Sequence, residues 1–181
     1  QELQAGDIIF QISKSSQSKA IQLATHSKYS HVGIIFENKG QLYVFEAVQP
    51  VKLTPLTQWI NRGENKHYVA KRLKEADKYL SEKALQDMTL VGNKFKGKDY
   101  DIYFGWSDDK IYCSELVWKI YQEALGIELG ELETLSDFDL SSDDVQQKMK
   151  ERYGNDFPKN EKVISPVAIF NSDKLVVVKE G

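Results

Sequence analysis

The chain has 181 residues, of which 41% are hydrophobic and 28% are charged, with a formal net charge of −3. This length fits one domain and buries enough surface to fold without a disulfide or a metal. The weakly acidic balance argues against a nucleic-acid-binding surface. No apolar run approaches the roughly 20 residues that a membrane-spanning helix needs.

The first half of the chain is predicted to be mainly β-structure. Residues 8–12 form an apolar run typical of a buried strand, and residues 20–24 favour a short helix. Residues 31–36 and 42–48 are β-rich runs separated by Asn38-Lys39-Gly40-Gln41, which predicts a hairpin. A short helix around Trp59 should end near Gly63, and residues 68–73 predict another strand.

Two long helices are predicted in the second half. Residues 81–96 carry apolar residues at helical spacing and are closed by Gly97, and residues 113–125 carry a broad apolar stripe that ends at Gly126. Residues 128–154 are polar and acid-rich, so we expect an insertion at about 128–160 within a single domain spanning 1–181. A short helix at Ser165-Pro166 and a strand at 175–179 follow, and the mixture predicts an α+β fold.

Cys113 is the only cysteine, so an internal disulfide is excluded. It begins the second long predicted helix, where the positive end of the helix dipole stabilises a thiolate. A lone cysteine more often acts as a small buried hydrophobic residue, and that interpretation stays open on this evidence alone. A histidine on a distant strand, His31, favours a reactive thiol.

The predicted hairpin places a carboxylate near His31. With Lys39-Gly40 at the centre of the turn, Gly33 pairs with Glu46, so His31, Gly33 and Glu46 share one face of the sheet. Glu46 is then the diagonal neighbour of His31, within reach of a long side chain, and Gly33 is expected to leave the space between them open. The carboxylate would fix the imidazole tautomer and leave one ring nitrogen for a thiol.

The polar residues also allow other interpretations. His31 alone fits a half-buried histidine bonded to a backbone carbonyl, and His26 and His67 compete for the catalytic role without a carboxylate placed by the hairpin. Residues 137–148 imitate a calcium loop but lack its glycine and its final glutamate, so Asp143 and Asp144 are interpreted as first-turn acids after a serine cap. One cysteine also falls short of a structural zinc site, and no metal is expected.

Three motifs together resemble a known family. Gly6-Asp7-Ile8-Ile9, then Tyr29-Ser30-His31-Val32-Gly33-Ile34 with the later Glu46, and then Tyr112-Cys113-Ser114-Glu115-Leu116-Val117 are similar to the circularly permuted branch of the NlpC-type papain-like superfamily. The similarity is strongest to the YiiX-like group of bacterial permuted amidases. In this branch the histidine strand precedes the cysteine helix, as it does here. The resemblance covers residues 6–126, with a weaker echo from Ser165 to the last strand.

The resemblance implies a permuted papain-like fold, with an antiparallel sheet or small barrel packed against helices. It implies a thiol hydrolase in which Cys113 is the nucleophile, His31 the general base and acid, and Glu46 the orienting residue. The backbone N–H of Cys113 would donate to the oxyanion, Tyr112 is an auxiliary candidate, and no cofactor is required. The aromatic residues Tyr103, Phe104 and Trp106 are candidates for a substrate groove.

The implied substrate is an amide, in a cell-wall peptide or a lipid-linked acyl group. A lipid acyltransferase or lipid hydrolase, and a non-catalytic lipid- or peptide-binding module, are the alternatives. The chain starts at Gln1 and its two methionines are internal, so we expect export to the bacterial periplasm after removal of a signal peptide, with the cytoplasm as the alternative. The oligomeric state is not predicted.

Overall fold

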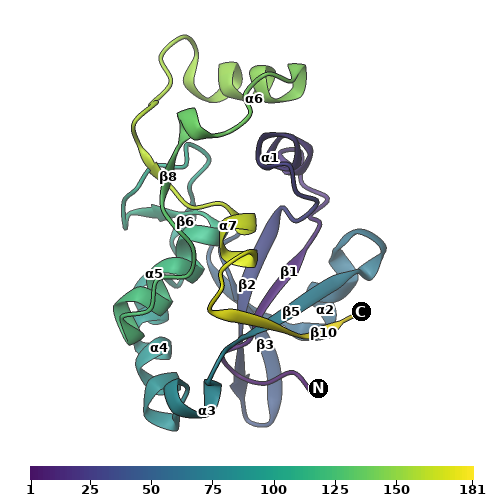
Figure 1. Cartoon of the computed structure of the whole chain (residues 1–181), viewed down its shortest axis with the longest axis vertical. Helices are drawn as coiled ribbons and strands as arrows, with labels where there is room; N and C mark the ends of the chain where they lie inside the picture. The colour runs from purple at the N-terminus through teal and green to yellow at the C-terminus, as the bar shows by residue number, and fades with distance from the viewer.

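The computed structural model describes residues 1–181 and is built around one antiparallel sheet (Figure 1). Its strand order is β10-β5-β1-β2-β3-β4, and every neighbouring pair is antiparallel. The strands are β1 (Ile8–Gln11), β2 (His31–Asn38), β3 (Gln41–Glu46), β4 (Lys52–Pro55), β5 (Tyr68–Leu73) and β10 (Leu175–Glu180).

Helices lie on both sides of this sheet and beyond its upper end in Figure 1. They are α1 (Ser18–Thr25), α2 (Leu56–Arg62), α3 (Ala76–Tyr79), α4 (Glu82–Phe95), α5 (Cys113–Leu125), α6 (Asp143–Tyr153) and α7 (Pro166–Phe170), with 3-10 turns η1 (Glu64–Lys66) and η2 (Leu135–Asp137). Two small sheets pair β6 (Asp99–Tyr100) with β7 (Lys110–Ile111) and β8 (Glu133–Thr134) with β9 (Lys162–Val163).

The alternation of side chains along the strands creates two cores. On one face, Ile8, Val32 and Ile34 join the larger core with the apolar stripes of α4 and α5. On the other face, Ile9 and Ile35 join a smaller core that α2 covers with Trp59. The α+β class and the antiparallel sheet packed against helices are therefore confirmed.

The hairpin has the predicted register. Asn38 pairs with Gln41 and Ile34 with Phe45, which fixes the faces of all side chains on β2 and β3. Gly33, however, does not leave an open space: a Cβ there would lie 2.4 Å from Cγ1 of Val44 and 2.9 Å from the carbonyl oxygen of Phe45. That expectation was wrong, because Val44 already fills the gap and glycine permits the close approach.

The cysteine helix begins and ends where the sequence predicts. α5 starts at Cys113 and stops at Gly126, which adopts the left-handed conformation with φ of 67°. The serine cap is also confirmed, because Ser142 accepts a hydrogen bond from the Val145 N–H at the start of α6. The strand β4 and the short elements α3, η1 and β6 to β9 are additions that sequence periodicity did not predict, since each is too short to carry a repeating apolar pattern.

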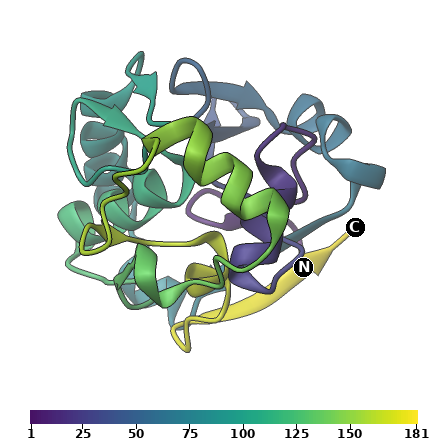
Figure 2. The same cartoon turned by 90° about the horizontal axis from the view of Figure 1, so that it is seen from above.

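The acid-rich segment folds over the upper end of the sheet. Its helix α6 packs against α1, and Figure 2 shows α6 lying across α1 when the molecule is viewed from above. Exposed contacts support this docking, including Lys19 with Asp144 at 3.4 Å and His26 with Asp139 at 2.7 Å. The insertion therefore packs onto α1, the helix that follows β1.

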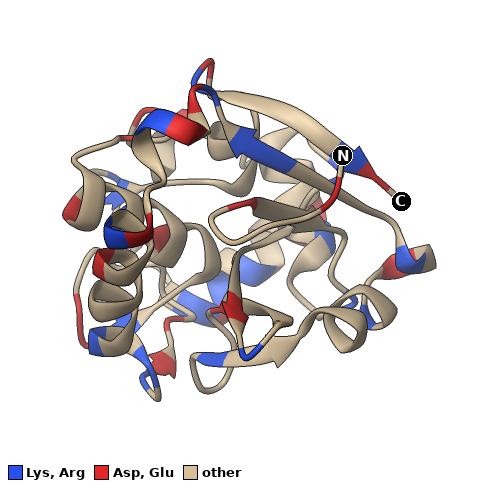
Figure 3. Cartoon of the chain, turned by 90° about the horizontal axis from the view of Figure 1, so that it is seen from below, with Lys and Arg blue, Asp and Glu red and all other residues tan.

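Charged residues of both signs are interspersed along the elements seen from below in Figure 3. None of the helices combines the length with the apolar character that crossing a bilayer demands.

Candidate active site

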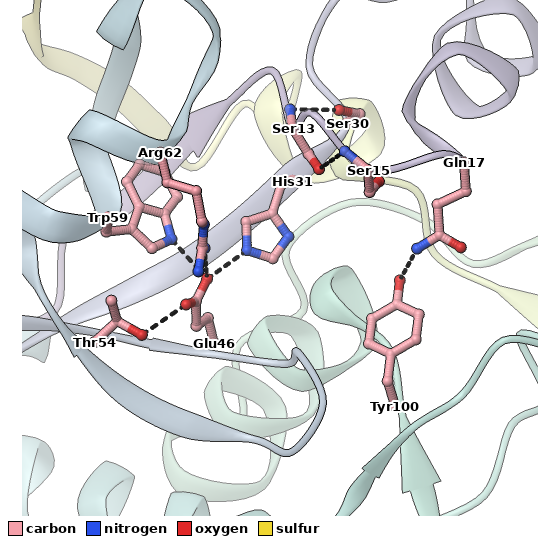
Figure 4. Close-up of polar contacts among 10 residues, drawn as sticks. All are labelled: Ser13, Ser15, Gln17, Ser30, His31, Glu46, Thr54, Trp59, Arg62 and Tyr100. Atoms are coloured by element: carbon pink, nitrogen blue, oxygen red, sulfur yellow. Dashed lines mark hydrogen bonds and ion pairs between the residues drawn. The ribbon is translucent and has the colours of Figure 1, made fainter.

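The Glu46 carboxylate accepts four side-chain hydrogen bonds. It is fully buried at the end of β3, and its Oε2 accepts hydrogen bonds from His31 Nε2 at 2.6 Å and Trp59 Nε1 at 2.8 Å. Arg62 donates to the same oxygen at 2.5 Å, and the Thr54 hydroxyl donates to Oε1 at 2.7 Å (Figure 4). Four donors from three different elements therefore hold one carboxylate in place.

These contacts keep Glu46 ionised. Burial by itself raises the pKa of a carboxyl group, but the hydrogen bonds and positive charges of His31 and Arg62 outweigh burial and lower the pKa of Glu46 to about 2. An ionised carboxylate only accepts hydrogen bonds, so Nε2 of His31 carries a proton. The other ring nitrogen, Nδ1, faces away from Glu46 (Figure 4).

His31 opens β2 and is 7% exposed. Its ring stacks on Trp59 with 6.0 Å between centroids, which limits rotation of the imidazole. Burial lowers the pKa of the imidazole, but the neighbouring Cys113 thiol and the Glu46 carboxylate outweigh burial and raise the pKa to about 9. At neutral pH the ring is therefore an imidazolium placed between a carboxylate and a thiol.

Cys113 supplies the thiol from the first residue of α5 and is 3% exposed. As the first helical residue, it has a backbone N–H with no acceptor inside the helix. Two contacts fix this end of α5: the Ser114 hydroxyl donates to the Ile164 carbonyl at 2.6 Å, and the Tyr112 N–H donates to Glu115 Oε1 at 3.3 Å. The fold thus brings Cys113, His31 and Glu46 together from α5, β2 and β3.

Glu115 anchors the same helix from below. Burial raises the pKa of Glu115 to about 8. The positive charge of Lys119, whose Nζ lies 2.9 Å from Glu115 Oε2, acts in the other direction and lowers that pKa. Lys119 also contacts Asp108 at 2.8 Å, so the pair ties the start of α5 to the preceding loop.

Tyr100 and Gln17 complete the surroundings of the thiol, and no motif in the sequence points to either residue. The Gln17 amide donates to the Tyr100 hydroxyl at 3.2 Å, on the side of His31 that faces away from Glu46 (Figure 4). Burial raises the pKa of Tyr100 well above its ordinary value, and the adjacent Cys113 raises it further. The phenol therefore stays neutral and can donate a hydrogen bond beside the thiol.

An apolar pocket of about 100 Å³ opens directly at Cys113. Fifteen of its 22 lining residues are hydrophobic. The walls come from α1, from the start of α5 and from the 128–160 insertion, which contributes two cations, Lys148 and Arg152, and the apolar residues Leu135, Phe138, Leu140, Val145, Met149 and Tyr153. The segment that the sequence presents as polar and acid-rich therefore turns its few apolar residues toward the thiol.

Only one of the three aromatic candidates for a substrate groove lines the pocket at Cys113. Phe104 lines the apolar pocket, whereas Tyr103 packs against Tyr153, and Trp106 packs against Trp118 outside the pocket. Tyr112 is 1% exposed and also lines the pocket, and its hydroxyl accepts a hydrogen bond from the Ile164 N–H at 3.2 Å.

The competing histidines lie elsewhere. His26 ends α1 and pairs with the exposed Asp139 at 2.7 Å. His67 lies 3.3 Å from the Tyr29 hydroxyl and 3.0 Å from the Gly181 carbonyl oxygen. Neither ring contacts Cys113, so the geometry singles out His31.

Comparisons with known proteins identify the family of this chain. Residues 2–179 match the family described as "Permuted papain-like amidase enzyme, YaeF/YiiX, C92 family". The chain is 54% identical over 175 residues to the uncharacterized protein YiiX of Escherichia coli K12, covering 97% of this chain and 85% of that protein. A crystal structure titled metalloprotein YiiX from Escherichia coli O157:H7 superposes with a TM-score of 0.96 at 52% identity, covering 100% of this chain and 99% of that one. The chain belongs to the permuted papain-like amidase family, and its activity is of the hydrolase type.

Proposed function

We propose that this protein is a cysteine amidase in which Cys113 is the nucleophile, His31 the general acid and base, and Glu46 the residue that orients His31. One observation carries the proposal: the buried His31 ring lies between an ionised carboxylate, 2.6 Å away, and the only thiol in the chain. An imidazolium next to a thiol favours its thiolate form, which is the reactive nucleophile.

The first half of the reaction forms an acyl-enzyme. The Cys113 thiolate adds to the amide carbonyl carbon, and the carbonyl oxygen takes the negative charge opposite the free backbone N–H of Cys113. His31 then gives its Nδ1 proton to the departing nitrogen, and the C–N bond breaks to release an amine and leave a thioester. Glu46 keeps its bond to Nε2 throughout, so the ring does not turn away.

The second half regenerates the enzyme. His31, now neutral at Nδ1, takes a proton from water while the water oxygen adds to the thioester carbonyl. The C–S bond then breaks, which releases a carboxylic acid and restores the thiolate and imidazolium pair. Each step moves one proton between substrate or water and His31, and none requires a redox partner.

The pocket at Cys113 favours an apolar acyl group as the part of the substrate that becomes the thioester. Its lining is dominated by aliphatic and aromatic side chains, and acyl chains gain free energy when such a surface removes them from water. This observation supports a lipid-linked acyl amide over a polar cell-wall peptide. It also supports the second candidate function, a lipid hydrolase or acyltransferase that acts on esters.

The crystal structure of the Escherichia coli relative is described as that of a metalloprotein. We therefore ask whether the residues of this chain could bind a metal ion. In this chain no group of three His, Cys, Asp or Glu side chains is arranged to hold an ion. Nε2 of His31 is already bound to Glu46, which leaves only Nδ1 and the Cys113 thiol as candidate ligands. A resident zinc site needs three or four protein ligands, so these residues do not fit one.

The test is covalent trapping followed by mass spectrometry. The protein is incubated with octanoyl p-nitroanilide and with octanoyl p-nitrophenyl ester, and acid-quenched samples are analysed for an octanoyl adduct. Cys113→Ala should abolish the adduct with both substrates, and His31→Gln should slow p-nitroaniline release by about 10²-fold. A wild-type protein that forms an adduct only with the ester would favour the lipid hydrolase, and unchanged anilide cleavage in Cys113→Ala would overturn the proposal.

A further inference from the structure

The 128–160 insertion is held at its base by a small sheet. β8 and β9 pair Glu133 with Val163 and Thr134 with Lys162, so the chain entering and the chain leaving the insertion lie side by side. Between them, the flap (residues 135–161) passes over α1 as α6 and returns to β9 (Figures 1 and 2). A segment whose two ends meet at one place can swing as a unit about that place.

Few of the contacts that hold the flap on α1 are buried. Val145 is the only buried residue of α6. Lys19 Nζ lies 3.4 Å from Asp144 Oδ2, and these two side chains are 73% and 51% exposed. The contact of His26 with Asp139 is also exposed to solvent. Ion pairs in such positions stabilise only weakly, so α6 can separate from α1 at little electrostatic cost.

One end of α6 has a backbone conformation that favours glycine. Gly154 follows the helix with φ of 63° and ψ of −124°. A Cβ at this position would meet no atom within 4 Å, so the backbone angles and not crowding call for glycine. At Gly130, in contrast, a Cβ would lie 2.6 Å from the carbonyl oxygen of Ala168, which shows that the start of the insertion is held closely against α7. The chain can therefore bend more readily at Gly154 than at Gly130.

The flap and α1 together cover the thiol. Cys113 is 3% exposed, and the pocket at its side chain has Ala20 of α1 in one wall and Val145 and Met149 of α6 in another. A second depression, beside His31, is not lined by Cys113. Contact of a reactant with the sulfur therefore requires α6 to move away from α1.

One better-shielded contact links the flap to the residues around the thiol. Arg152, in the last turn of α6, donates a hydrogen bond to Gln17 Oε1, and its guanidinium carbon lies 4.7 Å from the centre of the Phe104 ring. The amide nitrogen of the same Gln17 donates to the Tyr100 hydroxyl at 3.2 Å (Figure 4). Arg152 thus fastens the flap to both sides of the pocket at Cys113.

We propose that the flap is a lid: residues 135–161 lift from α1 to let a reactant reach Cys113, and Arg152 holds the lid in its closed position. This inference rests on the proposed function in taking Cys113 as the reacting group, and it adds how that group is reached. The rate at which a reagent modifies Cys113 then depends on the fraction of molecules whose lid is open. Lys19 and Asp144 influence this fraction although neither lines the pocket.

The test follows the modification of Cys113, the only thiol of the chain, by N-phenylmaleimide, with the adduct measured by mass spectrometry. Lys19→Glu places an anion opposite Asp144 and should increase the open fraction, so that modification is about threefold faster than in the wild type. The sign is informative, because an added negative charge by itself disfavours the thiolate and would slow the reaction. Lys19→Glu/Asp144→Lys restores opposite charges and should react more slowly than Lys19→Glu.

The role of Arg152 is tested with Arg152→Met, which keeps an apolar side chain over Phe104 and removes the hydrogen bond to Gln17. We expect modification of Cys113 to become about tenfold faster, again opposite in sign to the direct effect of removing a cation near the thiol. Amide hydrogen exchange gives a readout that does not involve the thiol. Exchange across α6 should become faster in Lys19→Glu and in Arg152→Met, while exchange in α5 stays unchanged.

The matched control is Lys83→Glu. Lys83 pairs with Asp87 at 3.1 Å on α4, which lies away from α6 in Figure 1, and the substitution changes the net charge as Lys19→Glu does. It should leave the modification rate and the exchange in α6 unchanged. Modification of Lys19→Glu and Arg152→Met that is no faster than that of the wild type, or faster modification without faster exchange in α6, would overturn the lid. If no octanoyl adduct forms although these variants behave as expected, the amidase proposal fails and the lid stands.

Discussion

Nε2 of His31 and Oε2 of Glu46 lie 2.6 Å apart because the β2–β3 hairpin turns at Lys39-Gly40 and at no other residue pair. A shift of the register by one residue would move Glu46 to the opposite face of the sheet, away from the imidazole. The contact therefore links a two-residue turn at one end of the hairpin to the chemistry at the other. Trp59 and Arg62 of α2 then close over the pair.

Glu46→Gln should impair both stability and activity. The neutral amide offers one acceptor oxygen to the donors that now share the carboxylate, and it leaves the charge of Arg62 unpaired. We expect the free energy of unfolding in urea to fall by about 3 kcal/mol and amide hydrolysis to fall by about 10²-fold. Glu64→Gln, at an exposed carboxylate in the neighbouring η1, is the control and should leave both unchanged. Full activity in Glu46→Gln would contradict the orienting role.

The pKa of His31 should depend on both of its neighbours. The Cys113 thiol and the Glu46 carboxylate together raise it to about 9 against the effect of burial. Removing either group should therefore lower it, and Cys113→Ala should do so without disturbing the hydrogen bond to Glu46. NMR titration of the imidazole resonances measures this directly, with the other two histidines of the chain as internal references. A His31 pKa that is the same in wild type and Cys113→Ala would mean that the thiol does not interact with the ring.

The same two groups contribute to the pH dependence of stability. The folded-state pKa of Glu46, about 2, lies below its ordinary value of 4.5, so its contribution is complete above pH 4.5 and is lost as pH falls toward 2. The folded-state pKa of His31, about 9, lies above its ordinary value of 6.5, so its contribution is complete below pH 6.5 and is lost as pH rises through 9. Glu115 acts in the same range: its folded-state pKa of about 8 lies above its ordinary value of 4.5, so its ionisation lowers stability as pH rises from 4.5 to 8. Urea unfolding across pH should therefore show a maximum near pH 4.5 to 5, with losses on both sides.

The contribution of Glu46 to the loss of stability at acid pH is isolated by subtracting the free energy of unfolding of Glu46→Gln from that of the wild type at each pH. The control is needed because Asp139, an exposed group, also has its pKa lowered to about 2, by hydrogen bonds from Ser141 and His26. If the difference between wild type and Glu46→Gln does not change between pH 5 and pH 2.5, Glu46 is not the source of the acid sensitivity.

Local rules predicted the parts of the site that lie on regular elements. The hairpin register placed His31 and Glu46 on one face, and the helix start placed Cys113 at an N-terminus. Tyr100 and Gln17 escaped prediction because they lie in a two-residue strand and a loop, where no periodicity marks them. The pairing of Arg62 and Trp59 with Glu46 depends on how α2 packs over the sheet, which is a long-range property.

The insertion shows the limit of composition as a guide. Residues 128–154 are polar and rich in acids, which is typical of a solvated surface, and most of these acids do face solvent. The apolar minority of the segment nevertheless forms one wall of the pocket at Cys113, as Val145 and Met149 of α6 illustrate. Only the docking of α6 on α1 brings these side chains to the thiol.

Filling this pocket should change which acyl chains the protein accepts. Ala24 on α1 lines the pocket, and Ala24→Phe adds a phenyl ring that occupies part of it. Each methylene of the acyl chain that can no longer be buried there loses about 0.8 kcal/mol of binding free energy. We expect kcat/KM for octanoyl p-nitroanilide to fall by about tenfold, with little change for acetyl p-nitroanilide, whose two-carbon acyl group stays at Cys113. Ala84→Phe makes the same substitution at another half-buried helical alanine, in the first turn of α4, and should affect neither substrate. Equal losses for both chain lengths in Ala24→Phe would indicate general damage to the site, and no loss for either would show that acyl chains bind elsewhere.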